Sequence, residues 1–203
     1  MKHILCYFVI ISISLNACSH NNESKCNLLL QKANNNLYQF YASNDTLSLL
    51  RAKSYIDSID CNSFKYKVFN TKITLFMLLN EYSAGIEYVK TLNSTDFHNK
   101  YQKNMYLKSF EAMLCEAQGD TIKSNNLYRE IISEIQLYLD KTTSKEALAD
   151  LFVIKSKIET KAEILKEIEL LKTKGKYDND FLNAVAKMQS ENNENSVVIP
   201  VKE

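Results

Sequence analysis

The chain has very few residues that turn the backbone sharply: three glycines and one proline among 203 residues. A β-sheet protein needs such residues at short intervals, because glycine supplies positive φ angles and proline fixes the first position of many turns. Gly85, Gly119, Gly175 and Pro200 are too few and too far apart for that. Hydrophobic residues make up 45% of the chain, which is enough for a continuous core. The sequence therefore predicts an all-α protein.

Apolar residues recur at three- and four-residue steps, which is the spacing of one buried helix face. This periodicity predicts about nine helices. The predicted helices span about 24–42, 45–60, 64–79, 82–92, 97–118, 121–139, a segment that starts after Ser144, 161–174 and 178–189. Side-chain oxygens that can accept from free backbone N–H groups precede several of them, and the predicted caps are Asn44-Asp45, Asp96, Asp120, Ser144 and the Thr160–Glu163 capping box.

The N-terminus differs from this body. Met1 to His3 form a short basic head, and Ile4 to Leu15 form an uncharged, largely apolar run of twelve residues. A membrane-spanning helix needs about 20 such residues, so the run is too short to be an ordinary span. A short basic head followed by a run of this length is typical of a secretory signal peptide.

The next residues, Leu15-Asn16-Ala17-Cys18, resemble the lipobox of bacterial lipoproteins. The resemblance implies that the signal peptide, residues 1–17, is cut between Ala17 and Cys18 and that Cys18 is lipidated. Several acyl chains would then anchor the protein without a spanning helix. The simpler alternative is a plain signal peptide followed by an incidental cysteine.

Residues 18–25 are polar and are expected to form a flexible tether between the anchor and the folded domain. Ser19, directly behind the lipidated cysteine, is compatible with sorting to the outer membrane. The expected location is thus the bacterial cell envelope, lipid-anchored and most plausibly at the outer membrane. Whether the protein faces the periplasm or the cell surface stays open.

Charge argues against nucleic acid as a partner. Removal of residues 1–17 takes away Lys2 and no acidic residue, so the remaining chain carries as many acidic as basic side chains. A nucleic-acid-binding protein would normally present a basic face, and this chain has only two arginines, Arg51 and Arg129.

The segment GDTIKSNNLYREII, residues 119–132, resembles the turn and second helix of a tetratricopeptide repeat. In that family a small residue lies where two helices cross, and a large residue follows four positions later; Ser124 and Tyr128 would have these roles. The corresponding small positions elsewhere are Ala52, Gly85, Ala112 and Ala162. The resemblance implies antiparallel helical hairpins stacked as a short solenoid over residues 26–189. An irregular helical bundle is the alternative.

Two cysteines stand at the ends of predicted helices. Cys26 begins the first helix of the body and Cys61 follows the second, and antiparallel helices bring such ends together. An oxidising compartment permits a Cys26–Cys61 disulfide, although two unpaired thiols are equally compatible with the sequence. Cys115 lies on the apolar stripe of its helix and is expected in the core.

No catalytic or metal-binding motif stands out, so the chain is predicted to be non-catalytic, without cofactor or metal. His98 and Cys115 could in principle form a base and a nucleophile. On one helix they would be about 25 Å apart, because each residue adds about 1.5 Å, and they could not touch.

Tyrosine is abundant, with twelve residues, and tryptophan is absent. Tyrosine anchors many binding faces because it combines apolar area with a hydroxyl group. In tetratricopeptide proteins the first helix of each hairpin lines the concave face. That resemblance implies a binding face made of tyrosines on those helices, namely Tyr38, Tyr41, Tyr66, Tyr101 and Tyr106, with packing in the core as the alternative role for each of them.

Two functions remain open at this point. The first is a membrane-anchored scaffold that binds an envelope protein or a peptide through its helical repeats. The second is an immunity-type or inhibitor lipoprotein that neutralises a toxin or enzyme acting in the envelope. The tail, residues 190–203, is expected to be disordered, with a strand that pairs with a partner's edge as the alternative.

Overall fold

The computed structural model describes residues 2–191, with side chains described from Asn22 to Ser190. In this range the protein is all-α, with nine α-helices and no strand, as the sequence predicts. The helices pack mainly as consecutive antiparallel pairs. The chain divides into two compact units, residues 1–80 and 81–203, where the sequence analysis had treated 26–189 as one domain.

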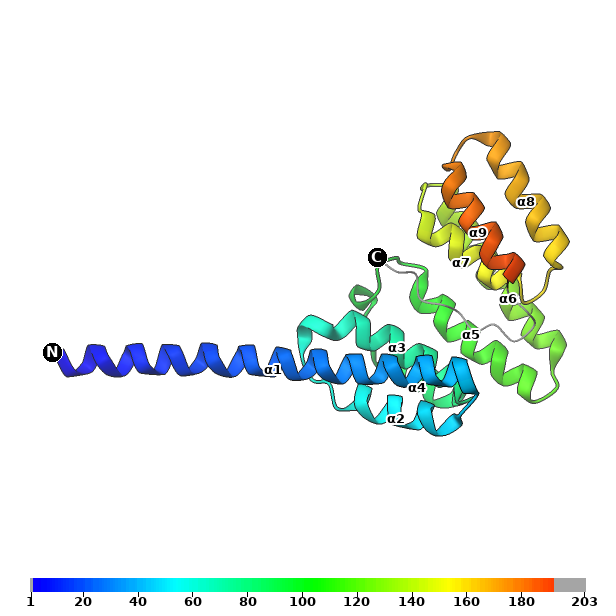
Figure 1. Cartoon of the computed structure of the whole chain (residues 1–203). Helices are drawn as coiled ribbons and strands as arrows, with labels where there is room; N and C mark the ends of the chain where they lie inside the picture. Colours follow the sequence, from blue (N-terminus) through cyan, green and yellow to red (C-terminus); the bar gives the residue numbers. More distant parts are fainter. Residues whose placement is uncertain (1, 192–203) are drawn as a thin grey trace. The chain divides into compact units, whose positions relative to one another are not determined.

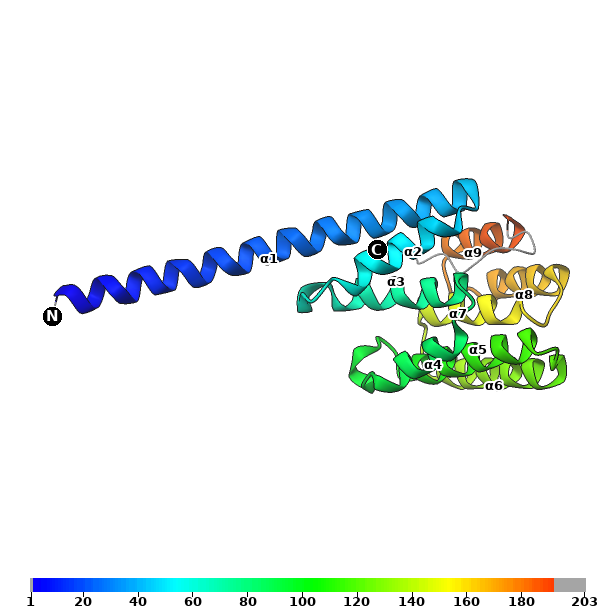
Figure 2. The same ribbon diagram turned by 90° about the horizontal axis from the view of Figure 1, so that it is seen from below.

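The first unit contains α1 (Lys2–Ser43), α2 (Thr46–Asp57), a short 3-10 helix η1 (Asn62–Phe64) and α3 (Lys65–Leu78). Figures 1 and 2 both show the C-terminal half of α1 running beside α2 in the opposite direction. Asn44 makes the turn between them with a positive φ of 55°. Asp45 caps α2 as predicted, and its side chain accepts from the backbone N–H of Leu47.

The core of the first unit lies where α1, α2 and α3 meet. Its fully buried members come from all three helices and are small or aliphatic, which lets the helices approach closely. They are Leu30, Ala33, Leu49, Ala52, Ile56 and Leu75. Ala52 is completely buried, in agreement with its predicted place at a helix crossing.

Helix α1 is longer than the sequence predicted. The expected tether, residues 18–25, lies inside α1 and is helical. The physical reason is that residues 2–43 contain neither glycine nor proline, so the backbone meets no residue that disfavours a helix strongly. The described side chains before Cys26 are nevertheless exposed, and Cys26 is the first buried side chain of α1 that the structure describes.

The second unit contains six α-helices and one 3-10 helix. They are α4 (Tyr82–Thr91), η2 (Ser94–Asp96), α5 (Gln102–Ala117), α6 (Thr121–Leu139), α7 (Lys145–Lys155), α8 (Lys161–Lys174) and α9 (Asn179–Glu191). Helix α9 includes the first two residues of the tail that was expected to be disordered, 190 and 191. Residues 192–203 lie outside the described part of the chain.

Most predicted helix caps are confirmed. Asp120 accepts from the backbone N–H of Lys123, Ser144 accepts from that of Ala147, and Thr160 and Glu163 form a complete capping box. Gly175 ends α8 in the left-handed conformation, with φ 64°, which a residue with a Cβ atom adopts only with strain.

The prediction that Asp96 caps the fifth helix is wrong. The Asp96 carboxylate instead accepts from the backbone N–H of Asn93 at 2.8 Å and closes a capping box on η2. Helix α5 consequently begins at Gln102, later than the sequence suggested. The Asp96 side chain satisfies a nearby backbone N–H instead of capping α5, as short polar side chains commonly do.

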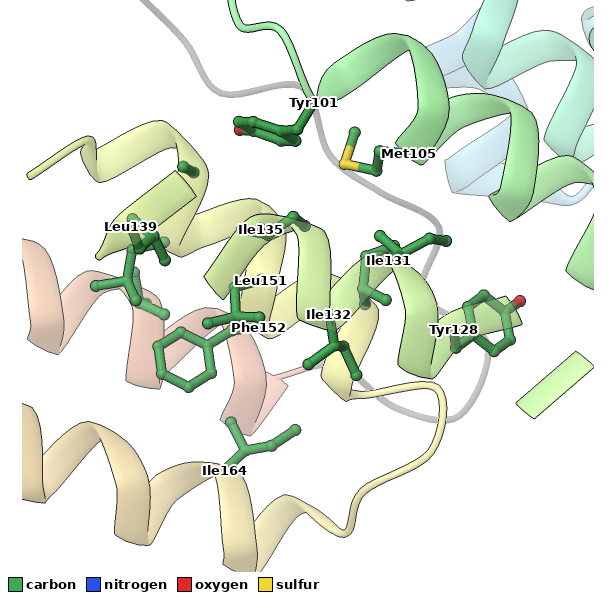
Figure 3. Close-up of a cluster of buried hydrophobic side chains, with 14 of the residues drawn as sticks. Tyr101, Met105, Tyr128, Ile131, Ile132, Ile135, Leu139, Leu151, Phe152 and Ile164 are labelled. Atoms are coloured by element: carbon green, nitrogen blue, oxygen red, sulfur yellow. The ribbon is translucent and has the colours of Figure 1, made fainter. Parts of the chain in front are cut away.

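The core of the second unit is formed mainly by α5, α6, α7, α8 and α9. Figure 3 shows Ile131, Ile132 and Ile135 of α6 facing the same interior as Leu151 and Phe152 of α7 and Ile164 of α8. Each of these side chains is buried, and burying one such side chain is worth about 1.5–3 kcal/mol. This cluster is the larger of the two cores.

The predicted small positions in this unit differ in their surroundings. Gly85, Ala112 and Ser124 are buried, and the hydroxyl of Ser124 donates to Glu116 Oε1 at 3.0 Å. Ala162, in contrast, is exposed, so it does not lie at a helix crossing. Ile164 and Ile168 form the buried stripe of α8, which packs chiefly against α9.

Gly85 allows α4 and α5 to approach closely. A Cβ atom at this position would lie 2.6 Å from two ring atoms of the fully buried Phe110. We expect Gly85→Ala to lower the free energy of unfolding by about 1–3 kcal/mol, because the ring has to move within a packed core. In an open helix the same change would instead stabilise by up to about 1 kcal/mol, so the sign of the effect is informative.

Thermal or urea unfolding of the purified protein measures this effect. Gly85→Ala should be less destabilising in a Phe110→Leu background than in the wild-type background, because the smaller side chain leaves room for the methyl group. An equal or greater stability of Gly85→Ala in the wild-type background would show that the α4–α5 contact is not sterically limited by Phe110.

Candidate functional site

Two of the five tyrosines predicted to form a binding face are exposed on α1. Tyr38 is 66% exposed and Tyr41 is 48% exposed. They are three residues apart on one helix and therefore lie on neighbouring positions of its surface. Tyr41 also contacts the ring of Phe40, with ring centroids 5.8 Å apart, and this contact restricts its orientation. Exposed tyrosines in such a position can supply apolar contact area and a hydroxyl group to a partner.

The other three predicted tyrosines have different surroundings. Tyr66 is half-buried on α3, and its ring contacts Phe69. Tyr106 is half-buried on α5, while Tyr101 is only 6% exposed and belongs to the core of the second unit. Tyr101 therefore cannot contribute its ring to a binding surface. Because Tyr66 lies in the first unit and Tyr101 and Tyr106 in the second, the five tyrosines do not belong to one compact unit.

The structure joins Cys26 and Cys61 in a disulfide that links α1 to the segment between α2 and α3. The Cα atoms lie 6.3 Å apart. The bond closes a loop with a sequence separation of 35 residues, for which the loop-entropy relation gives a stabilisation on the order of 4 kcal/mol. Cys115 is a free thiol buried in the second unit. His98 precedes α5, whereas Cys115 lies near the C-terminal end of that helix.

The lipobox-like residues, including Cys18, lie within the backbone of α1, but their side chains are outside the described part of the structure. In the part of the chain that is described, no helix is both long enough and apolar enough to cross a membrane.

A cluster of buried and partly buried polar groups connects the start of α5 with α7. We call it the α5–α7 polar cluster; its members are Asn99, Tyr101, Gln102, Tyr138, Glu146 and Asp150. Glu146 accepts from Asn99 Nδ2 at 2.8 Å and from Gln102 Nε2 at 3.0 Å. The Tyr101 hydroxyl donates to Asp150 Oδ2 at 2.7 Å. The Tyr138 hydroxyl donates to Asn99 Oδ1 at 2.8 Å, so α6 is connected to the cluster as well.

Asp150 has an altered acidity in this cluster. Burial disfavours its charged form and raises the pKa of its carboxyl group to about 6, and the negative charge of Glu146 adds to this effect. Hydrogen bonds from Tyr101 and Gln102 lower the pKa of Asp150, but by less than burial and the charge of Glu146 raise it. The pKa of the Tyr101 hydroxyl is raised too, by burial and by the charge of Asp150, so Tyr101 remains a hydrogen-bond donor at neutral pH.

This arrangement fastens the segment before α5 to α7. The hydrogen bonds of Glu146 and Asp150 connect residues 44–49 positions apart in the chain. His98 lies at the edge, with its Nδ1 atom 4.0 Å from Glu146 Oε1, and is half exposed. Neither carboxylate belongs to a recognisable sequence motif. Glu146 and Asp150 follow each other at one helical turn, but such pairs are common on solvated helices and give no signal by themselves.

The raised pKa of Asp150 makes the stability of the protein depend on pH. Between the ordinary carboxyl pKa and about 6, the folded state binds more protons than the unfolded state, so stability falls as pH rises. We expect the free energy of unfolding to decrease between pH 4.5 and 7.5 by at most about 3 kcal/mol through this group. Asp150→Asn should abolish that part of the dependence, because an amide does not ionise.

Urea unfolding at a series of pH values measures this dependence. The exposed carboxylate of Glu111 on α5 provides a control, and Glu111→Gln should leave the pH profile of the wild-type protein nearly unchanged. A profile for Asp150→Asn that parallels the wild-type profile over this pH range would contradict Asp150 as the source of the pH dependence.

Comparison with known proteins gives no relative. No protein-family model matches the chain, and neither a curated protein sequence nor a solved structure matches it. The function has to be inferred from the motifs and the geometry of the chain itself.

Proposed function

We propose that the protein is a lipoprotein of the bacterial cell envelope that is anchored through Cys18 and binds another envelope protein or a peptide with its helical hairpins. In this role it is a non-catalytic scaffold, most plausibly at the outer membrane. The observation that carries the binding part of the proposal is the exposure of Tyr38 and Tyr41 on α1.

The anchor is supported by the sequence context of Cys18. A basic head, an apolar run of twelve residues and a small residue before the cysteine occur together and in the order that lipoprotein processing requires. The Cys26–Cys61 disulfide is compatible with an envelope location, because disulfides persist mainly in oxidising compartments.

The binding role is supported by the surface of the first unit. Besides the two tyrosines, Leu28 on α1 and Leu47 and Leu50 on α2 are large apolar side chains that are about half exposed or more. Single exposed apolar residues are common, but tyrosine is enriched among the residues that dominate the energy of protein interfaces. The helix that carries Tyr38 and Tyr41 is also the helix that contains the proposed anchor.

Lipidation can be tested directly. We expect cells that express the wild-type chain and are fed an alkyne-bearing palmitate analogue to produce a labelled protein in the membrane fraction. Cys18→Ala should remove the label and slow or prevent signal cleavage, whereas Cys115→Ala should keep both label and cleavage, since Cys115 is buried in the fold. Labelling of the Cys18→Ala chain would refute the anchor.

Partner binding can be tested with a photoreactive side chain. With p-benzoylphenylalanine in place of Tyr38, irradiation of intact cells should yield a discrete adduct. Tyr41→Ala in the same chain should reduce the adduct at least several-fold, because truncation of an interface aromatic typically costs more than 1 kcal/mol. The matched control is Ile122→Ala, which removes an apolar side chain that is 77% exposed in the second unit.

The same photoreactive residue at position 122 gives the background of non-specific capture. Adducts from position 38 no stronger than those from position 122 would contradict a binding surface on α1. An adduct that forms only when a toxin or envelope-targeted enzyme is produced in the same cells would favour an inhibitor over a constitutive scaffold.

A further inference from the structure

Asp60 lies beside both sulfur atoms of the Cys26–Cys61 disulfide. Its Oδ1 atom is 3.7 Å from Cys26 Sγ and 3.9 Å from Cys61 Sγ. Cys26 is buried at 1% exposure, Cys61 is partly exposed and Asp60 is exposed, so solvent reaches the group. The ligand atoms of the three residues all lie within 4.8 Å of one another, and in the described part of the chain this is the one such group of His, Cys, Asp and Glu side chains.

We propose that Cys26, Asp60 and Cys61 form a binding site for a thiophilic divalent cation such as Zn²⁺ when the disulfide is reduced. Two thiolates and a carboxylate are ligands that Zn²⁺ accepts in tetrahedral sites, and a water molecule completes the fourth position from the solvent. The site is independent of the proposed scaffold function, because it concerns only the link between α1 and the α2–η1 junction.

The geometry fits tetrahedral coordination. With Zn–S distances of about 2.3 Å and a Zn–O distance of about 2.1 Å, a tetrahedral angle places sulfur and oxygen about 3.6 Å apart. In the disulfide form the corresponding separations are 3.7 and 3.9 Å; they change when the sulfurs move apart on reduction, but they place the Asp60 carboxylate within reach of both sulfurs. The two sulfurs need a separation of about 3.8 Å, which the Cα–Cα distance of 6.3 Å accommodates by side-chain rotation.

Reduction and metal binding convert the disulfide form into the metal-bound form in two steps. A dithiol reductant breaks the S–S bond, is itself oxidised to a disulfide and leaves two thiols on Cys26 and Cys61. Binding of one divalent cation then releases the two thiol protons, because only thiolates coordinate the metal. In either state α1 stays connected to the start of η1, by a covalent bond or through the cation.

Cobalt is a suitable probe because its thiolate complexes absorb in the near ultraviolet. The experiment uses the full chain with Cys6→Ser, Cys18→Ser and Cys115→Ala, so that Cys26 and Cys61 are the only thiols. We expect the reduced protein, kept free of oxygen, to bind one Co²⁺ per chain with a sulfur-to-cobalt charge-transfer band. The oxidised protein should show no such band, and Zn²⁺ should displace the cobalt.

Variants identify the ligands. Cys61→Ser should abolish the charge-transfer band of a two-thiolate site, and Asp60→Asn should weaken cobalt binding at least tenfold. The matched control is Asp57→Asn, which removes a carboxylate three residues earlier that pairs with Lys72 at 2.9 Å and should leave the affinity unchanged. Equal affinities of the Asp60→Asn and Asp57→Asn chains, or a stoichiometry of one metal per two chains, would overturn the proposal.

Circular dichroism separates metal binding from loss of the fold. We expect the reduced protein to keep or regain its helical signal with Zn²⁺ and to unfold at a higher temperature with the metal than without it. If the reduced chain loses helical signal and Zn²⁺ fails to restore it, the proposed site does not exist in the folded protein.

Discussion

The hydrogen bonds that end and begin the helices are the interactions on which this fold depends. With so few glycines and prolines, the chain has almost no residue that breaks a helix by its backbone alone. Boundaries are instead set by side-chain oxygens of Asp45, Asp120, Ser144 and Thr160, which accept from backbone N–H groups that would otherwise lack partners. Residues 2–43 contain serine and asparagine side chains but neither glycine nor proline, and the helix continues through them.

This dependence explains which features the sequence could predict. Caps act over two or three residues, so their partners can be predicted from the neighbouring sequence, and most helix boundaries follow from them. The all-α class follows from the scarcity of glycine and proline. The prediction for Asp96 was wrong because its carboxylate accepts from Asn93 in the turn before it and α5 starts six residues later, at Gln102. The prediction that Ala162 lies at a helix crossing was wrong, because small residues at near-regular spacing do not reveal which face of α8 is buried.

The candidate sites needed more than local information. The α5–α7 polar cluster joins residues more than forty positions apart. The spacing of Asn99, Glu146 and Asp150 in the sequence does not predict that they belong to one cluster. The approach of Cys26 to Cys61 was foreseeable as one of two alternatives, since a hairpin brings its ends together. The position of Asp60 beside both sulfurs could not be predicted, although Asp60 directly precedes Cys61. The burial of Tyr101 could not be predicted either, because it results from packing against α6 and α7.

The packing of consecutive helices also bears on how the protein folds. Most helix pairs in each unit are neighbours in the chain, so contacts form over short loops, and topologies of this kind fold fast. The first unit has all of its helices once residue 80 has been made, and it can therefore fold while the second is still being synthesised. Within the first unit, closure of the α1–α2 hairpin brings Cys26 next to Cys61, so folding of this hairpin favours their oxidation.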